Sequence, residues 1–307
     1  MAESGVLGAV RGTAEAAVVT PVLSISHLCV TYPGQGVGSR AVEDVSIDLY
    51  RGEIVAVVGE SGSGKSTLVR SVIRLLPTTA DISGTVGVVG PDGHRYDDLL
   101  ALQNRGLRQV RGKVVGFVPQ GTSGALNPVV SIRRQFELTL RSEKTSKQER
   151  RERAVQALFD AGVRDFDAVW QAYPHELSGG LAQRVVLALA ICRRPSVLLA
   201  DEPTTALDPI VQADVLARLR GAVTESRSAA LLITHDLGVA ARYADRLVVM
   251  RHGRVIEAGR VAEVVSDPQH PYTRELLASG VGRGAALLES PDEGHGREER
   301  VDRGHGQ

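Results

Sequence analysis

A glycine-rich segment of the chain has the residue types and the spacing of a loop that binds phosphate groups. It consists of Gly59, Glu60, Ser61, Gly62, Ser63, Gly64, Lys65, Ser66 and Thr67, which fit the pattern G-x-x-x-x-G-K-[ST]. Glycines allow the backbone to wrap closely around a polyphosphate, with its N–H groups turned inward at a helix N-terminus. Lys65 is expected to reach the β- and γ-phosphates, and the Ser66 hydroxyl to bind Mg²⁺. The segment therefore predicts that the chain binds a nucleotide with Mg²⁺.

The residues on either side of this loop have the patterns of a buried strand and a helix. Ile54–Val58 is an apolar, mostly β-branched run, while Leu68–Leu76 has helical spacing and stops at Pro77. A glycine-rich turn within the core is the structural alternative to a phosphate-binding loop. Because both flanks match the order strand, loop, helix, we favour the phosphate-binding loop.

Two acidic residues follow another buried strand. The run Val197–Ala200 ends at Asp201 and Glu202. Parallel strands present their carboxyl ends to one crevice, so both acids are expected beside the phosphate loop. Asp201 is suited to hold Mg²⁺ through water, opposite Ser66, and Glu202 to polarise the water that attacks the γ-phosphate. Taken alone, an Asp-Glu pair is more often an acidic cluster at a helix N-terminus.

Two further polar residues are expected at strand ends. Gln120 closes the strand-like run 112–119, and His235 follows the strand predicted at Ala229–Thr234. His235 is placed to contact the γ-phosphate and to sense its presence. A lone histidine at such a position is more often structural than functional.

A second anion site is predicted where Ser178, Gly179 and Gly180 precede an apolar helix. One chain needs only one polyphosphate site, so the second site would serve a nucleotide held by another molecule. This reasoning predicts a head-to-tail dimer with two ATP molecules between its subunits. The alternative is a helix cap whose glycines allow close packing.

The adenine ring has two candidate partners. Tyr32 ends a strand-like segment and could stack on the base, while Arg40, after the Pro33–Ser39 loop, could do the same. Ordinary packing is the alternative for Tyr32, and the sequence does not separate the two residues.

Composition excludes some classes of protein. The chain has 307 residues with 36 basic and 36 acidic side chains, so it lacks the basic excess of a nucleic-acid-binding protein. No apolar run approaches the roughly 20 residues of a membrane span. Alternating strands and helices imply a mostly parallel sheet that is covered on both faces.

The combined motifs resemble those of the ATP-binding subunit of an ABC transporter. In that resemblance the matches are Gly59–Thr67 to Walker A, Val197–Asp201 to Walker B, Glu202 to the catalytic glutamate, Gln120 to the Q-loop, Leu177–Gln183 (LSGGLAQ) to the signature motif, Ala206–Asp208 to the D-loop and His235 to the H-switch. It implies that Ser66, Asp201 and Gln120 hold Mg²⁺, and that Ser178, Gly179, Gly180, Gln183 and Asp208 contribute to ATP binding.

The resemblance also implies a fold and a domain plan. The fold is an α/β P-loop NTPase core of the RecA-like kind, with an antiparallel β subdomain and an inserted α-helical subdomain. We expect a disordered leader at residues 1–20, an ABC ATP-binding domain at 21–280 with its helical subdomain at about 121–176, and a disordered tail at 281–307.

The implied activity is ATP hydrolysis that drives import through separate membrane proteins. The expected partners are two permease subunits, a second ABC ATPase (identical or different), and, through the permeases, an extracytoplasmic solute-binding protein. The implied location is the cytoplasmic face of the cell membrane. A soluble ABC-type ATPase acting on ribosomes or nucleic acid, and the ATPase of an exporter, are the alternatives.

Two short blocks, Gly124–Pro128 and Asp267–Leu277, resemble the peptide, nickel and opine importer branch of the family. Many peptide-importing members carry a cysteine-containing extension after the second block, and Gly280–Gln307 contains no cysteine. The transported solute therefore stays open among a peptide, nickel and a metal–opine complex.

Overall fold

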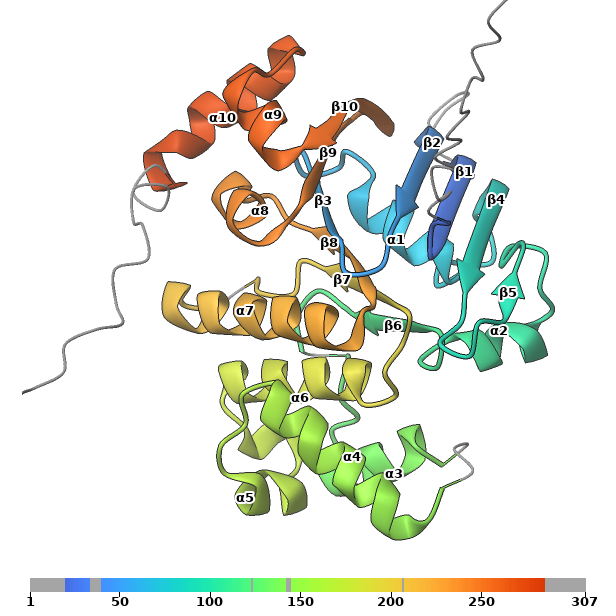
Figure 1. Cartoon of the computed structure of the whole chain (residues 1–307), viewed down its shortest axis with the longest axis vertical. Helices are drawn as coiled ribbons and strands as arrows, with labels where there is room; N and C mark the ends of the chain where they lie inside the picture. Colours follow the sequence, from blue (N-terminus) through green and yellow to red (C-terminus); the bar gives the residue numbers. More distant parts are fainter. Residues whose placement is uncertain (1–19, 34–39, 123, 142–144, 206, 285–307) are drawn as a thin grey trace, which may run out of the picture.

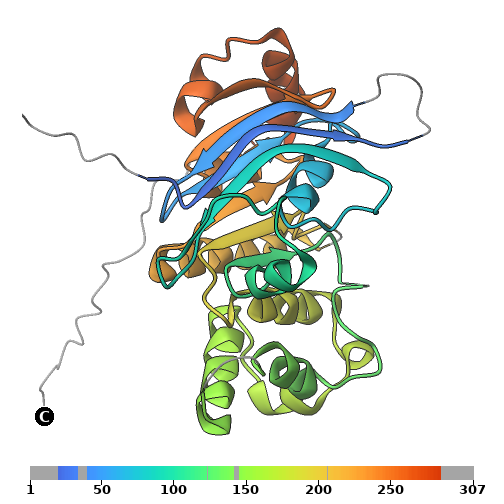
Figure 2. The same ribbon diagram turned by 90° about the vertical axis from the view of Figure 1, so that its right-hand side faces the viewer.

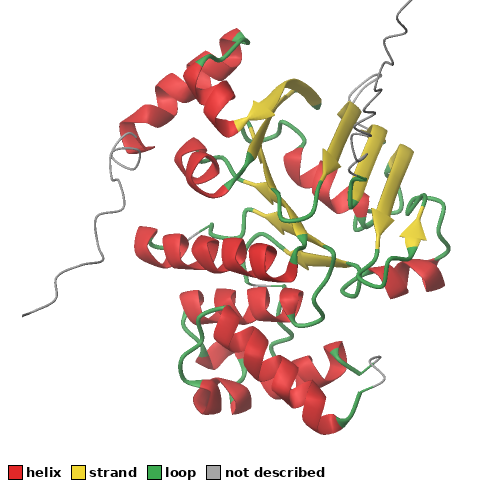
Figure 3. Ribbon diagram, in the orientation of Figure 1, coloured by secondary structure: helices red, strands yellow, loops and turns green. Residues whose placement is uncertain are grey.

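The structure is a computed structural model that describes residues 20–33, 40–122, 124–141, 145–205 and 207–284. Two β-sheets lie side by side, and helices cover the free face of the larger sheet and extend beyond one of its edges (Figures 1 and 3). The predicted leader lies outside the described residues except for Thr20, and the predicted tail except for residues 281–284. Those four residues belong to a helix that runs past the expected domain end at 280.

The larger sheet has six strands, and most of them are parallel. In sheet order they are β10 (Arg254–Arg260), β9 (Arg246–Arg251), β3 (Ile54–Val58), β8 (Ala229–Ile233), β7 (Val197–Asp201) and β6 (Val115–Val118). β3, β6, β7, β8 and β9 pair in parallel, while β9 and β10 form an antiparallel hairpin. The predicted parallel sheet is therefore confirmed.

Strand β3 shows why its sequence is apolar throughout. Val55 and Val57 pack on the face that meets the smaller sheet, whereas Ala56 and Val58 pack on the opposite face against helices. Side chains alternate between the two faces of a strand, so a strand covered on both sides needs apolar residues at every position.

The smaller sheet is antiparallel and has four strands. In sheet order they are β2 (Arg40–Leu49), β1 (Leu23–Thr31), β4 (Asp81–Val89) and β5 (Arg95–Tyr96). Helix α1 (Lys65–Val72) lies between the two sheets and packs Leu68 and Val69 into their shared core. Strand β1 is continuous from Leu23 to Thr31, although its register with both neighbouring strands shifts near His27.

The remaining helices are α2 (Asn104–Val110), α3 (Ile132–Thr139), α4 (Lys147–Asp160), α5 (Phe166–Gln171), the 3₁₀ helix η1 (Pro174–Glu176), α6 (Gly179–Ile191), α7 (Pro209–Ser226), α8 (Leu237–Tyr243), α9 (Val261–Ser266) and α10 (Pro271–Gly284). The helices α3 to α5 lie at one end of the molecule beside α6, and α9 and α10 lie at the opposite end (Figures 1 and 2). None of the helices in the described ranges has both the length and the hydropathy required to span a membrane.

Candidate nucleotide-binding and catalytic site

The predicted chemical groups meet at the carboxyl ends of four neighbouring strands. The loop Gly59–Gly64 follows β3, His235 follows β8, Glu202 follows β7, and Gln120 follows β6, in sheet order β3-β8-β7-β6. Such an edge is where ligands bind in open α/β sheets. The fold therefore brings together residues that are far apart in the sequence.

The loop between β3 and α1 needs its glycines for steric reasons. Gly59, Gly62 and Gly64 have φ values of 150°, 81° and 102°, which L side chains rarely adopt. A Cβ atom on Gly59 would lie 2.1 Å from the Met250 carbonyl oxygen, and one on Gly64 would lie 2.2 Å from that of Ala41. Strands β2 and β9 therefore hold the loop in a path that only glycine can follow.

We expect Gly59→Ala to disrupt ATP binding and to lower the thermal unfolding midpoint, because the Met250 oxygen belongs to a paired strand that cannot move aside. Gly52→Ala is the matched control: Gly52 also has a positive φ of 80°, but no atom that the structure describes would lie within 4 Å of its Cβ. The control should show only the strain of a left-handed residue, about 1–2 kcal/mol, and should bind ATP normally. Calorimetric titration and thermal unfolding of both variants test this, and equal effects would contradict the steric argument.

Lys65 is buried at the start of α1, where it is 5% exposed. Its ammonium group donates hydrogen bonds to the carbonyl oxygens of Gly59 and Glu60, both at 2.7 Å, and to Ser63 Oγ at 3.3 Å. Burial lowers the pKa of Lys65, although the nearby carboxylates of Glu202, Asp201 and Glu60 act in the opposite direction. The cation therefore lies inside the loop, held by groups that phosphate oxygens can replace.

Asp201 is fully buried at the end of β7. Its carboxylate accepts a hydrogen bond from Ser66 Oγ at 2.7 Å and two from the Arg70 guanidinium, at 2.9 and 3.1 Å. Sequence reasoning missed Arg70, although Ser66 and Arg70 are four residues apart on one helix and therefore share a face. Hydroxyl and carboxylate oxygens side by side suit Mg²⁺, which prefers oxygen ligands.

The Glu202 carboxylate lies close to three other polar side chains. Its Oε2 atom accepts hydrogen bonds from Gln120 Nε2 at 3.2 Å and from Thr205 Oγ1 at 2.9 Å, and His235 Nδ1 lies 3.5 Å away. Glu202 has a positive φ of 46°, a strained conformation of the kind found at functional sites. Thr205, which the sequence analysis did not single out, belongs to this cluster.

The predicted second anion site lies at the N-terminus of α6. The Ser178 hydroxyl caps the helix by accepting from the Leu181 N–H. A Cβ on Gly180 would approach the Val211 side chain at 2.9 Å, whereas one on Gly179 would meet no atom within 4 Å in the described ranges of the chain. Gly180 is thus explained by packing against α7, but Gly179 faces open space.

The other predicted ATP contacts near this turn have partners within the chain. The Gln183 side chain is buried and donates a hydrogen bond to the Pro203 carbonyl, so it supports the loop that follows Glu202. Asp208 caps α7 by accepting from two backbone N–H groups. Ala206 lies outside the described residues.

The two adenine candidates differ in position. Tyr32 is half-buried, and its hydroxyl lies 3.5 Å from Thr67 Oγ1 at the end of the phosphate loop. Arg40 is exposed, with its guanidinium 3.7 Å from Glu43. Tyr32 therefore lies beside the loop, and stacking on adenine stays a prediction for both residues.

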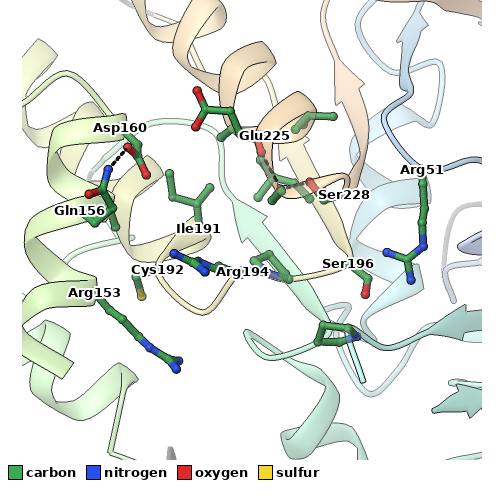
Figure 4. Close-up of a pocket in the computed structure, with 17 residues that line it drawn as sticks. Arg51, Arg153, Gln156, Asp160, Ile191, Cys192, Arg194, Ser196, Glu225 and Ser228 are labelled. Atoms are coloured by element: carbon green, nitrogen blue, oxygen red, sulfur yellow. Dashed lines mark hydrogen bonds between the residues drawn. The ribbon is translucent and has the colours of Figure 1, made fainter. Parts of the chain in front are cut away.

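A separate cavity of about 530 Å³ lies at the opposite end of the strands (Figure 4). Its lining includes Ser196 and Ser228, which precede β7 and β8, and Arg51, which precedes β3. The cavity is therefore distinct from the site that contains Lys65 and Glu202.

Comparisons with known proteins agree with this geometry. The ABC transporter family model matches residues 42–205. The chain is 45% identical over 260 residues to the peptidoglycan transport ATP-binding protein YejF of Agrobacterium fabrum, covering 84% of this chain and 47% of that protein. It is 38% identical over 264 residues to the oligopeptide transport ATP-binding protein OppD of Bacillus subtilis, covering 85% and 72%. The chain thus spans about half the length of one relative and most of the other.

Solved structures have the same fold. The dimeric post-hydrolysis state of the ATP-binding cassette MJ0796 bound to ADP and Pi is similar with a TM-score of 0.66 and 28% identity, over 78% of this chain and 98% of that one. The protein cbiO1 from Clostridium perfringens, part of the ABC transporter complex cbiONQ, has a TM-score of 0.67 and 26% identity, over 87% and 97%. The predicted P-loop NTPase fold is confirmed, and the chain belongs to the ABC transporter family of ATP-binding proteins.

Proposed function

We propose that this chain is the ATP-hydrolysing subunit of an ABC importer that takes up peptides. The observation that carries the proposal is the Glu202 carboxylate, which accepts hydrogen bonds from Gln120 and Thr205 next to the loop that contains Lys65. A carboxylate held in this way is suited to orient water for attack on a γ-phosphate.

Each residue of the site has a distinct part in the proposed reaction. Lys65 exchanges the loop carbonyls for phosphate oxygens, while the N–H groups of the loop orient the phosphates. Glu202 receives the proton of the attacking water, with Gln120 and His235 fixing the direction of its carboxylate. Ser66, Asp201 and Gln120 would hold Mg²⁺, which neutralises phosphate charge.

A second ABC ATPase subunit completes the proposed site. Gly179 lies exposed at the N-terminus of α6, and no atom of the residues that the structure describes lies within 4 Å of a Cβ built there. A phosphate of a nucleotide held by the partner would fit against that helix end. The related cassette MJ0796 is described as dimeric, which supports the proposal.

Gly179→Asp tests the dimer without disturbing the monomer. A Cβ at position 179 meets no atom of the described residues within 4 Å, and the new carboxylate would repel the γ-phosphate of the partner's ATP. We expect an unchanged unfolding midpoint and loss of ATP-dependent dimerisation in light scattering, measured with a hydrolysis-deficient chain. Gly221→Asp is the control, because a Cβ on Gly221 of α7 likewise has no neighbour within 4 Å among the described residues. Dimers of the Gly179 variant at wild-type yield would refute the head-to-tail arrangement.

The proposed contact with the permeases is a groove beside the catalytic cluster. A cavity of about 510 Å³ has a lining that includes the apolar side chains of Leu75, Phe117 and Leu189 as well as Gln120. A helix of a membrane subunit would dock there through apolar side chains. Gln120 also bonds Glu202, so it would connect the docked helix to the reaction.

The transported solute is inferred from the relatives. YejF and OppD are named as peptidoglycan and oligopeptide transport ATP-binding proteins, which supports a peptide cargo over nickel or a metal–opine complex. The proposed assembly contains two permeases and an extracytoplasmic solute-binding protein, with this chain on the cytoplasmic face of the membrane.

The test is mass spectrometry of the proteins that co-purify with the Glu202→Gln chain from gently solubilised native membranes with ATP. Two permeases, a second ABC ATPase and a solute-binding protein would support the importer, and ligands of that binding protein would identify the solute. Ribosomal or DNA-bound partners without membrane proteins would overturn the transport proposal.

A further inference from the structure

The block Asp267–Leu277 has a contact with the phosphate loop that the proposed reaction does not use. Tyr272 lies in the first turn of α10 and is 2% exposed. Its ring packs in an apolar cluster with Ala56 and Val58 of β3, the strand that leads directly into the loop. The Tyr272 hydroxyl accepts a hydrogen bond from the Glu60 N–H at 3.0 Å.

This bond and one from Lys65 hold the two ends of one peptide unit. The unit that joins Gly59 to Glu60 has its carbonyl oxygen 2.7 Å from Lys65 Nζ and its N–H bonded to Tyr272. The C=O and N–H of a trans peptide point in opposite directions. Lys65 and Tyr272 therefore hold the start of the loop from opposite sides.

Contacts with neighbouring residues fix the position of Tyr272 and of the start of α10. The Arg251 guanidinium lies 4.5 Å from the centroid of the Tyr272 ring, and the Tyr272 N–H donates to His270 Nδ1 at 3.1 Å. Glu257 on β10 in turn accepts hydrogen bonds from the backbone N–H groups of Gln269 and His270. The start of α10 is thus fastened to the β9–β10 hairpin, which also supplies the Met250 oxygen against Gly59.

We propose that Tyr272 is a positioning residue that holds the phosphate loop in its ATP-binding conformation. The inference rests on the proposed ATP site. When Lys65 leaves the loop carbonyls for the phosphates, the Gly59–Glu60 peptide keeps Tyr272 as its remaining polar anchor. Without the hydroxyl, Lys65 still holds this peptide in the nucleotide-free protein, but after ATP binds neither of the two side-chain hydrogen bonds that the described residues make to it remains. Loss of the hydroxyl therefore destabilises the ATP-bound state more than the nucleotide-free state, which lowers the affinity for ATP.

Tyr272→Phe in the full-length chain tests the proposal, because it removes only the hydroxyl group. We expect ATP with Mg²⁺ to bind about three- to tenfold more weakly, the value of one net hydrogen bond, as measured by calorimetric titration. Tyr243→Phe is the matched control: the Tyr243 hydroxyl is likewise hydrogen-bonded to a backbone group, donating to the Ala213 carbonyl at 3.1 Å on a different part of the fold. Both variants should unfold at slightly lower temperatures, but only Tyr272→Phe should change ATP affinity.

Measuring Tyr272→Phe in a chain that already carries Glu60→Pro distinguishes an effect on the position of the loop from an effect on the stability of the fold. Glu60→Pro removes the N–H donor itself, so Tyr272→Phe should have no further effect on ATP affinity in that chain. A wild-type ATP affinity for Tyr272→Phe, or a loss equal to that of Tyr243→Phe, would overturn the inference. Failure of the wild-type chain to bind ATP would instead overturn the proposed function. If Glu60→Pro does not fold, the comparison of the two phenylalanine variants decides.

Discussion

Glu202→Gln is expected to slow ATP hydrolysis by roughly 10²–10⁴-fold, the usual contribution of a positioned base, and to leave ATP binding intact. Glutamine keeps the length of the side chain and one oxygen that can accept from Gln120 and Thr205, so the cluster around this position should persist. It cannot take a proton from water at neutral pH. Phosphate release and ATP titration on the same preparation measure the two properties separately.

The same variant should accumulate as an ATP-bound dimer, since hydrolysis is the step that opens the proposed assembly. Glu225→Gln is the control: Glu225 is exposed near the end of α7 and lines the cavity at the opposite end of the sheet. That control should hydrolyse ATP at the normal rate. Turnover of Glu202→Gln within about twofold of wild type would remove Glu202 from its assigned role.

Lys65→Ala is expected to weaken ATP binding by roughly 30- to 3,000-fold, the range for removing one member of a buried, hydrogen-bonded charge pair. The loop would keep its N–H groups but would lose the ammonium group at its centre. Because burial lowers the pKa of Lys65, the folded chain binds this proton less tightly than the unfolded chain does. At neutral pH the burial of the charge therefore opposes folding, whereas the three hydrogen bonds of the ammonium group favour it, so the two effects of Lys65→Ala on the unfolding midpoint act in opposite directions.

The measurement is the shift in unfolding temperature caused by ATP. Wild type should be stabilised by added ATP, since a ligand that binds only the folded state raises its stability, whereas Lys65→Ala should show almost no shift. Lys113→Ala serves as control, because Lys113 is exposed and lies 3.7 Å from Asp92 on the surface. An ATP-induced shift of wild-type size in Lys65→Ala would contradict the assignment.

The elements nearest the phosphate loop were predictable because their signals are local. Strand β3 has the predicted bounds Ile54–Val58, since five consecutive apolar residues suit a strand that is buried on both faces. Strand β4 was not predicted, because Gly84 and Gly87 interrupt its pattern and three of its central residues are exposed. Helix α1 ends at Val72, before the predicted Leu76, because Arg74 adopts a positive φ of 51°.

The residues of the site could also be predicted from the sequence, but their contacts with distant segments could not. The spacing of Lys65, Asp201 and Glu202 indicated the reaction, and the parallel sheet indicated that they would meet. Nothing in the local pattern pairs Arg70 with Asp201, or Tyr272 with Glu60, because these contacts depend on how non-adjacent elements pack. The block around Tyr272 resembles one branch of the family, but this resemblance does not indicate which atoms of the chain the tyrosine contacts.

The contact between Tyr272 and Glu60 also has a consequence for synthesis, because it joins positions 212 residues apart. At translation rates of about 5–20 residues per second, the loop leaves the ribosome roughly 10–40 s before its tyrosine is made. During that interval the growing chain has the loop and Lys65 but lacks the anchor on the Gly59–Glu60 peptide. Docking of α10 should therefore raise the affinity of the loop for ATP by the same factor, about three- to tenfold, so that ATP stabilises chains in which α10 has docked more than chains in which it has not.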